Sequence, residues 1–413
     1  MMGVFQRIKD SLSTKNKWTI LTLAWGIGVI CLHLQYVHLS GTDFTKDFKD
    51  LEHQKDFTKD FKDVELQKPV LKSQGYDVLL NSYMRAGSSL TGMVFGYRSD
   101  SFYVYEPLWK ISQWTYLHGN SAVCKADRLE CRHVEPGTEY QDKASADKKR
   151  PPGSLVIAKN ILHNTYDCQF QDYERMVFEP LVTAKFGGPS WNTMRECLKH
   201  KSKYKTCFQR HMPKKCKDST HKVTKVLRLT TDLLAPVLQS RDNLKAIHLF
   251  RDPRAIINSR IETDWYPAGT EKLVIENAES LCNKMLYDFR EGQKVQKLFP
   301  DRFRFIYYED FSVDVLNKSK ILYNYLGMTE NDKYYPEIIK YPAAKNAASV
   351  ETERKKNTAY WWRKTFKWEL VEKMEEICKD VYKELGYKSF SNIQEYSDLS
   401  IPSVVIPKEY LIV

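Results

Sequence analysis

Two short segments carry the residue types that bind phosphate groups, and each directly follows an apolar run. The first reads Ser-Tyr-Met-Arg-Ala-Gly-Ser-Ser-Leu-Thr-Gly over residues 82–92. Its small residues let backbone N–H groups approach an anion, and a helix starting there adds partial positive charge. Arg85 adds a planar cation with several donors. The Gly-Lys-Ser/Thr ending of a Walker A loop is missing, so the segment predicts a different phosphate cradle. The alternative is an ordinary strand-to-helix turn.

The second segment reads Leu-Phe-Arg-Asp-Pro-Arg-Ala-Ile-Ile-Asn-Ser-Arg over residues 249–260. Pro253 suits the first turn of a helix. Arg251 then stands at the end of a strand, where open α/β sheets bind their ligands. An arginine and a serine such as Ser259 can hold a phosphate through charge-assisted and neutral hydrogen bonds. The alternative is an Arg–Asp ion pair that caps the helix.

Strands and helices alternate from about residue 74 and would position both segments. The pattern predicts strands at residues 76–80, 155–158, 246–250 and 303–308, and helices at 90–96, 224–239, 252–261, 270–297 and 366–385. Such alternation is typical of an α/β fold, in which helices cover a parallel sheet on both faces. Two polar stretches that contain cysteines, residues 119–153 and 197–222, are interpreted as insertions on this core.

The N-terminal part predicts a membrane anchor. Residues 18–37 form an apolar run long enough to cross a bilayer as a helix. Lysine and arginine precede it, so we expect residues 1–17 to be a cytosolic tail and the rest to be lumenal. Residues 38–73, in which a thirteen-residue unit occurs twice, suit a solvated stem before the main domain at 74–413. A cleaved signal peptide is the alternative.

Together the two phosphate segments resemble the nucleotide signatures of Golgi carbohydrate 6-O-sulfotransferases, which sulfate C6 of galactose, N-acetylgalactosamine or N-acetylglucosamine. That family carries Arg-Ser-Gly-Ser-Ser-Phe where this chain has residues 85–90. It carries Arg-Asp-Pro-Arg-Ala and a later serine where this chain has residues 251–255 and Ser259. The resemblance covers roughly residues 76–390 and departs from the family at Ala86, which replaces a serine, and at Leu90, which replaces an aromatic residue.

The resemblance implies a membrane-bound Golgi enzyme with a P-loop-like α/β domain, the sulfotransferase fold. It would transfer a sulfuryl group from 3′-phosphoadenylyl sulfate (PAPS) to a sugar hydroxyl of a glycan or proteoglycan. The first segment would hold the 5′-phosphosulfate and the second the 3′-phosphate. The residues expected to bind the nucleotide are Met84, Arg85, Ala86, Gly87, Ser88, Ser89, Leu90, Arg251, Asp252, Pro253, Arg254, Ala255, Ile256, Ile257, Asn258 and Ser259. No metal ion is required, because a sulfuryl group carries less charge than a phosphoryl group.

The resemblance also suggests catalytic residues. Arg85 would stabilise the leaving phosphate, and Glu106, in a Phe-Tyr-x-x-Glu-Pro-Leu phrase that the family shares, would be the general base. A glutamate that only forms a salt bridge is the alternative, and His118, His163 and His248 are rival bases. Two other functions stay open: a catalytically inactive glycan-binding protein, and a P-loop-like nucleotide kinase, for which the chain lacks the Walker lysine.

Charge and cysteines bear on partners and compartment. The net charge of +12 favours anionic partners, and a lumenal domain argues against nucleic acid. Eight of nine cysteines lie outside the apolar run, an even number that predicts disulfides in an oxidising compartment. The alternative for the cluster of Cys and His residues at 197–216 is a zinc site. Lysine-rich residues 199–225 predict either a surface for an anionic glycan or a solvated loop. Asn317 begins an Asn-x-Ser sequon, so we expect a glycoprotein.

Overall fold

The computed structural model describes residues 75–109, 115–119, 122–126, 129, 131–133, 155–170, 187–200, 203–263, 271–329 and 359–411. The predicted tail, anchor and stem lie outside these residues, as does most of the first predicted insertion. Among the helices that the structure describes, none combines the length and apolar character needed to cross a membrane.

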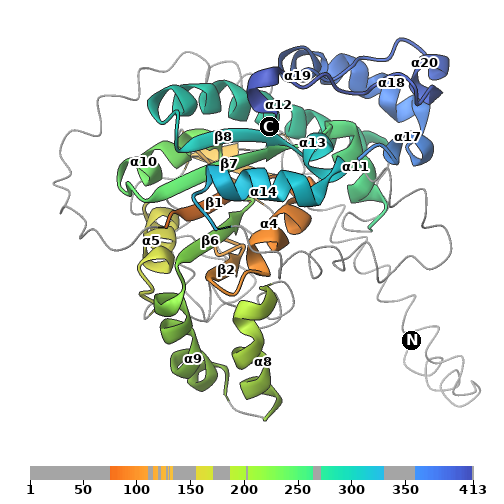
Figure 1. The fold of residues 1–413 in the computed structure, drawn as a ribbon. Coiled ribbons are helices and arrows are strands. Elements are labelled where there is room, and N and C mark those ends of the chain that lie inside the picture. Colours follow the sequence, from red (N-terminus) through yellow and green to blue (C-terminus); the bar gives the residue numbers. More distant parts are fainter. Residues whose placement is uncertain are drawn as a thin grey trace, which may run out of the picture. The chain divides into compact units, whose positions relative to one another are not determined.

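The core is one parallel sheet of five strands in the order β2-β6-β1-β7-β8 (Figure 1). The strands are β1 (Asp77–Ser82), β2 (Ser101–Tyr105), β6 (His221–Val226), β7 (Leu244–Phe250) and β8 (Phe303–Tyr307). All four neighbouring pairs are parallel. A small antiparallel sheet is formed by β3 (Thr115–His118), β4 (Ala122–Lys125) and β5 (Cys131–His133). The α/β prediction is therefore confirmed.

Helices cover both faces of the large sheet, as alternate strand residues show. Leu79 of β1 belongs to an apolar cluster with α5 (Leu155–Tyr166), α10 (Leu234–Gln239) and α12 (Glu271–Leu298). Its neighbours Val78 and Leu80 belong to a second cluster with α4 (Ser88–Gly96) and α14 (Val315–Tyr325). Successive residues of a strand point to opposite faces, so the two clusters are the two layers over the sheet.

The remaining helices extend these layers. They are the short turn η2 (Gly188–Trp191), α8 (Asn192–Lys199), α9 (Tyr204–Asp218), η3 (Thr231–Leu233), α11 (Pro253–Ile261), α13 (Tyr308–Val313), α17 (Trp362–Thr365), α18 (Trp368–Ile377), α19 (Lys379–Leu385), α20 (Ile393–Ser397) and η5 (Lys408–Tyr410). The predicted helices at 90–96, 252–261, 270–297 and 366–385 are confirmed, the last with a break at Cys378.

Two sequence predictions are wrong. Residues 155–158 begin helix α5, because Ala158, Ile161 and Leu162 continue the apolar pattern at helical spacing and are buried together. The predicted helix at 224–239 starts as β6, a strand between β1 and β2. The predicted insertion at 197–222 consists largely of helix α9, which packs against the edge strand β2, and only its last two residues belong to the sheet, as the start of β6.

Candidate active site

The loop after β1 adopts a backbone that glycine makes possible. Gly87 has φ 88° and precedes α4, and no side chain caps the first turn of that helix. A Cβ at Gly87 would lie 2.2 Å from the Tyr308 ring, so a larger residue does not fit. Arg85 also has a positive φ, 73°, a strained conformation that clusters at functional sites. The first N–H groups of α4 have no partner within the helix and can receive an anion.

The structure brings the two phosphate segments together at the carboxyl end of the sheet. Arg85 Nε donates to Ser259 Oγ over 3.1 Å, and Arg251 Nη1 donates to the Arg85 backbone oxygen over 2.9 Å. The Arg251 guanidinium also lies 4.6 Å from the centre of the Tyr308 ring. Burial and the charge of Arg251 lower the pKa of Arg85. Two neighbouring guanidinium groups and a hydroxyl make this corner suitable for an anion.

Other residues of the second segment face the protein interior. Asp252 accepts from the Arg254 backbone N–H and caps α11. The Arg254 side chain is fully buried and binds both Asp252 and Glu375. Pro253 and the apolar residues that follow are likewise buried, among them Ile256 and Ile257. These residues hold α11 in place, whereas Arg251 and Ser259 lie beside Arg85.

Glu309 supports the second segment from the end of β8, and the sequence reading did not assign it a role. Its Oε1 accepts from the Asp252 backbone N–H over 2.8 Å. Burial raises the pKa of this carboxyl to about 7. The signal in the sequence was its place two residues after the end of the buried strand β8, near the position at which ligand-edge residues occur in such sheets.

Glu106 stands directly after β2 and has φ 48°. Its carboxylate is buried between two cations: Lys225 Nζ lies 3.0 Å from Oε1, and Arg228 Nη2 lies 3.5 Å from Oε2. Burial by itself raises the pKa of Glu106, but the charges of Lys225 and Arg228 outweigh it, so the pKa is below its ordinary value. Glu106 is therefore ionised at neutral pH.

Tyr105 is the last residue of β2 and precedes Glu106. It lies close enough to lower the pKa of Glu106 and to affect the pKa of Arg85 electrostatically. The Lys225 ammonium lies 3.6 Å from the centre of the Tyr105 ring. The candidate base, its two cations and the anion-binding loop thus belong to one charged region. The sequence reading missed Lys225 and Arg228 because it assigned residue 225 to a helix.

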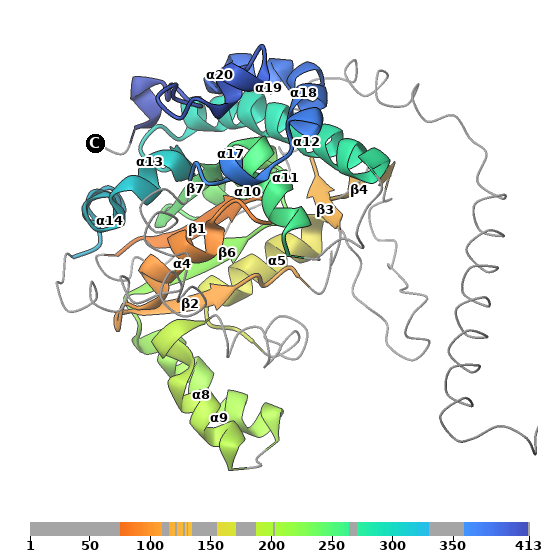
Figure 2. The same ribbon diagram turned by 90° about the vertical axis from the view of Figure 1, so that its right-hand side faces the viewer.

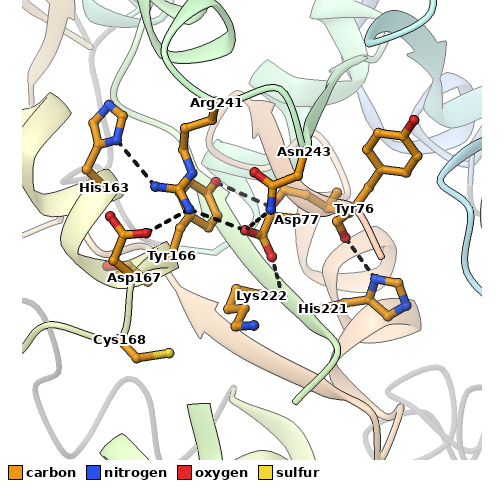
Figure 3. Close-up of polar contacts among 12 residues, drawn as sticks. Tyr76, Asp77, His163, Tyr166, Asp167, Cys168, His221, Lys222, Arg241 and Asn243 are labelled. Atoms are coloured by element: carbon orange, nitrogen blue, oxygen red, sulfur yellow. Dashed lines mark hydrogen bonds and ion pairs between the residues drawn. The ribbon is translucent and has the colours of Figure 1, made fainter. Parts of the chain in front are cut away.

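The three rival histidines have other surroundings. His163 hydrogen-bonds Ser240 and lies beside Arg241, which pairs with Asp77 at the start of β1 (Figure 3). In a parallel sheet this is the edge opposite to the one that Glu106 occupies. The His118 ring packs at a tilt against the ring of Tyr287, with ring centres 4.2 Å apart.

His248 belongs to a fully buried network beneath the anion-binding loop. It hydrogen-bonds Tyr83 over 2.9 Å, and Tyr83 donates to Asp288, which also accepts from Lys284. Burial lowers the pKa of His248 well below its ordinary value, so the ring is neutral. The network fixes Tyr83, two residues before Arg85, and thereby supports the loop from below.

The eight cysteines outside the predicted anchor form four disulfides, as expected for an oxidising compartment. The pairs are Cys124–Cys131, Cys168–Cys216, Cys197–Cys207 and Cys282–Cys378. The alternative zinc site at 197–216 is wrong, because its three sulfurs are engaged in disulfides. Within the described ranges, no group of three or more His, Cys, Asp or Glu residues is placed to hold a metal ion.

Comparisons with known proteins point to one family. A family model described as "Sulfotransferase domain" matches residues 40–386. Carbohydrate sulfotransferase 1 of Danio rerio is 24% identical over 363 residues, which cover 81% of this chain and 83% of that protein. Carbohydrate sulfotransferase 5 of Mus musculus is 25% identical over 359 residues, covering 80% and 85%.

Among solved structures, the sulfotransferase domain of the Synechococcus PCC 7002 olefin synthase aligns at 15% identity with a TM-score of 0.36. The alignment covers 76% of this chain and 98% of that chain.

Proposed function

The chain belongs to the sulfotransferase domain family, and from this premise we propose that it transfers a sulfuryl group from PAPS to a sugar hydroxyl. The observation that carries the proposal is the joining of the two phosphate segments by Arg85. This residue bonds Ser259 through its side chain and Arg251 through its backbone. One nucleotide with phosphates at its 5′ and 3′ positions needs two such anion sites close together.

In this proposal the donor lies across the carboxyl end of β1 and β7. The N-terminus of α4 and Arg85 hold the 5′-phosphosulfate, and Arg251 and Ser259 hold the 3′-phosphate. Tyr308 packs against Gly87 and Arg251 and so keeps both segments in register. Preorganised donors of this kind stabilise charge that develops during the reaction, because they need not reorient.

The reaction is an in-line displacement at sulfur. The sugar oxygen forms the new S–O bond while the bond from sulfur to the bridging phosphate oxygen breaks, and 3′,5′-adenosine bisphosphate leaves. Arg85 and the α4 N–H groups stabilise the negative charge on the departing phosphate. Glu106 accepts the proton of the sugar hydroxyl. An ionised carboxylate has about four acceptor positions, so Glu106 can bind both Lys225 and Arg228 and still receive this proton.

The acceptor in this proposal is C6 of galactose, N-acetylgalactosamine or N-acetylglucosamine in a glycan or proteoglycan. The names of the two carbohydrate sulfotransferases support a sugar as the acceptor class. The similarity of residues 85–90 to the 6-O-sulfotransferase signature supports C6. An inactive glycan-binding protein is disfavoured because Arg85 and Arg251 are both present and joined.

The test is an incubation of the purified full chain with PAPS labelled in its sulfate group and a panel of neutral and acidic glycans. Label should pass to a glycan, and Arg85→Ala should abolish the transfer. Glycan binding without transfer would identify a binding protein. Transfer of phosphate from labelled ATP, with no transfer from PAPS, would identify a kinase.

We further propose that the protein is a single-pass type II protein of the Golgi membrane, anchored by residues 18–37. The basic flank before this run supports a cytosolic N-terminus, and the four disulfides suit an oxidising lumen. In sealed microsomes, residues 74–413 should resist added protease. Digestion of this domain without detergent would refute the topology.

A further inference from the structure

Helices α8 and α9 form a hairpin outside the nucleotide region. Figures 1 and 2 both show the two helices beyond β2, the edge strand, and projecting away from the sheet. Nothing in the proposed reaction uses them. The packing, charge and position of the two helices suggest that they have a separate function.

The hairpin is built as a rigid body. Cys197–Cys207 joins α8 to α9, and Cys168–Cys216 fastens the end of α9 to the segment that follows α5. Phe208 of α9 is fully buried, with its ring centre 6.3 Å from that of Trp191 and 5.4 Å from that of Phe170. Apolar residues thus face inward, and crosslinks hold both ends.

The outward surface is strongly basic. Residues 192–218 contain nine lysines and arginines against two acidic residues, a net charge of +7 out of +12 for the whole chain. Among the described residues of the hairpin, the exposed cations are Lys199, Lys203, Lys205, Arg210, Lys214 and Lys217. The two acidic residues, Glu196 and Asp218, each lie beside an exposed lysine. More than half of the net charge is therefore concentrated on this hairpin, and an anionic partner would fit it.

The base of the hairpin lies on the strand that leads to the candidate catalytic base. Trp191 Nε1 donates to the Tyr103 backbone oxygen over 2.8 Å, and Ser190 Oγ donates to the Ser101 backbone oxygen over 2.7 Å. Tyr103 stands three residues before Glu106, which is about 10 Å along an extended strand. The nucleotide segments follow β1 and β7, on the far side of β6. The hairpin therefore lies beside β2, on the side of the sheet away from the nucleotide segments.

We propose that this basic hairpin binds an anionic polysaccharide, namely the stretch of a long acceptor chain beyond the sugar that is modified. A linear chain with repeated carboxylate or sulfate groups can lie along the exposed lysines while one of its sugars reaches Glu106. The proposal rests on the sulfotransferase function and specifies its acceptor. An anionic membrane surface fits less well, because surface-bound helices expose apolar side chains to the lipid. The exposed large apolar residues of the described chain lie elsewhere, on other helices and at the C-terminus.

The test replaces Arg210, Lys214 and Lys217 with glutamine in the full chain. A charge-matched control replaces Lys294, Lys297 and Lys379, which are exposed on α12 and α19. The first assay measures, without PAPS, the salt concentration at which each protein elutes from immobilised heparin. The second measures KM for a long sulfated polysaccharide and for a short neutral oligosaccharide with the same terminal sugars.

The hairpin variant should elute at lower salt than the control, because contacts between exposed charges are screened by salt. Its KM for the long anionic acceptor should rise about tenfold, since three exposed contacts each contribute a factor of roughly two to three. The KM for the neutral oligosaccharide, the KM for PAPS and the kcat values should stay unchanged. All substituted side chains are exposed, so the melting temperature should match that of the wild type.

Four outcomes would overturn the proposal. If the hairpin and control variants elute from heparin at equally reduced salt, only the net charge of the protein matters. If KM rises equally for the long anionic and the short neutral acceptor, the substituted residues have a structural role. Loss of binding to phosphatidylserine vesicles with unchanged elution from heparin would identify a membrane contact. Loss of binding to an acidic protein alone would identify a protein partner. If no glycan is sulfated but elution from heparin still depends on the hairpin, the proposed sulfotransferase reaction is wrong, whereas the hairpin still binds anionic polysaccharide.

Discussion

Glu106 shares its buried site with two cations, so removing its charge should affect both stability and catalysis. At 3.0 Å and 3.5 Å, the attractions of Lys225 and Arg228 to the carboxylate amount to about 5 kcal/mol each at an effective dielectric constant of about 20, before the cost of desolvation. Glu106→Gln leaves these two cations without their counter-charge. Breaking a buried ion pair in this way costs about 3–5 kcal/mol. A loss of activity in this variant alone would therefore not identify a base.

A double substitution separates the two effects. Glu106→Gln with Lys225→Met restores the net charge of the wild-type cluster, so we expect most of the lost free energy of unfolding to return. The base, however, is still missing, so kcat should remain lower by about a hundredfold or more. Urea unfolding with the disulfides intact measures the first quantity, and the initial rate with labelled PAPS measures the second. If the double variant regains both stability and activity, Glu106 is only the ionic partner of Lys225.

The single variant Lys225→Met completes a double-mutant cycle for Glu106 and Lys225. It keeps Glu106 and should keep most of the activity, but the pKa of Glu106 should rise, since one of the two charges that lower it is gone. The acidic limb of the pH–rate profile should therefore move to higher pH. The folded-state pKa of Glu106 lies below the ordinary value of about 4.5, so the ionised carboxylate stabilises the wild-type fold above that pH. This stabilisation is lost as the pH falls through the folded-state pKa. An unchanged acidic limb would contradict the assignment of Glu106 as the base.

Four further predictions concern the nucleotide corner and the fold. Arg251→Ala should remove a charge-assisted phosphate contact of about 1.5–3 kcal/mol. The KM for PAPS should rise, and the binding of the product 3′,5′-adenosine bisphosphate should weaken, by about ten- to a hundredfold. If calorimetry finds an unchanged affinity for 3′,5′-adenosine bisphosphate, Arg251 does not bind the 3′-phosphate. Gly87→Ala should lower PAPS affinity and the melting temperature together, because its Cβ meets the Tyr308 ring and its φ is positive. The pKa of Glu309 is about 7 in the folded protein and about 4.5 in the unfolded chain, so the wild-type fold should lose about 3 kcal/mol of stability as the pH rises between those values. Glu309→Gln does not titrate, so its unfolding free energy should increase relative to that of the wild type over this range. A difference that stays constant with pH would show that Glu309 does not titrate there. Replacing Cys282 and Cys378 together by serine should cost about 2–5 kcal/mol in urea unfolding, since their bond closes a loop of 96 residues between α12 and the C-terminal helices.

The sequence by itself determined the class of fold and the position of the nucleotide corner. The apolar runs that became β1, β7 and β8 are short, buried and followed by helices, which is sufficient to predict a parallel sheet. In such a sheet, loops after the strands meet at one edge, so Arg85 and Arg251 had to come close. The even number of cysteines likewise predicted disulfides without showing which residues pair.

Only the tertiary structure decided which short segments are strands and what surrounds the candidate base. Strand β6 reads His-Lys-Val-Thr-Lys-Val, with charged residues that local pattern does not assign to the centre of a sheet. Lys225 is stable there because its ammonium meets Glu106, which lies 119 residues away in the chain. Helix α5 was misread for a related reason, since four apolar residues fit a buried strand or a helix equally well until the packing of Ile161 and Leu162 is known. Local spacing records the period of an element, whereas the partner of a buried charge is set by contacts between distant segments, which form only when the chain folds.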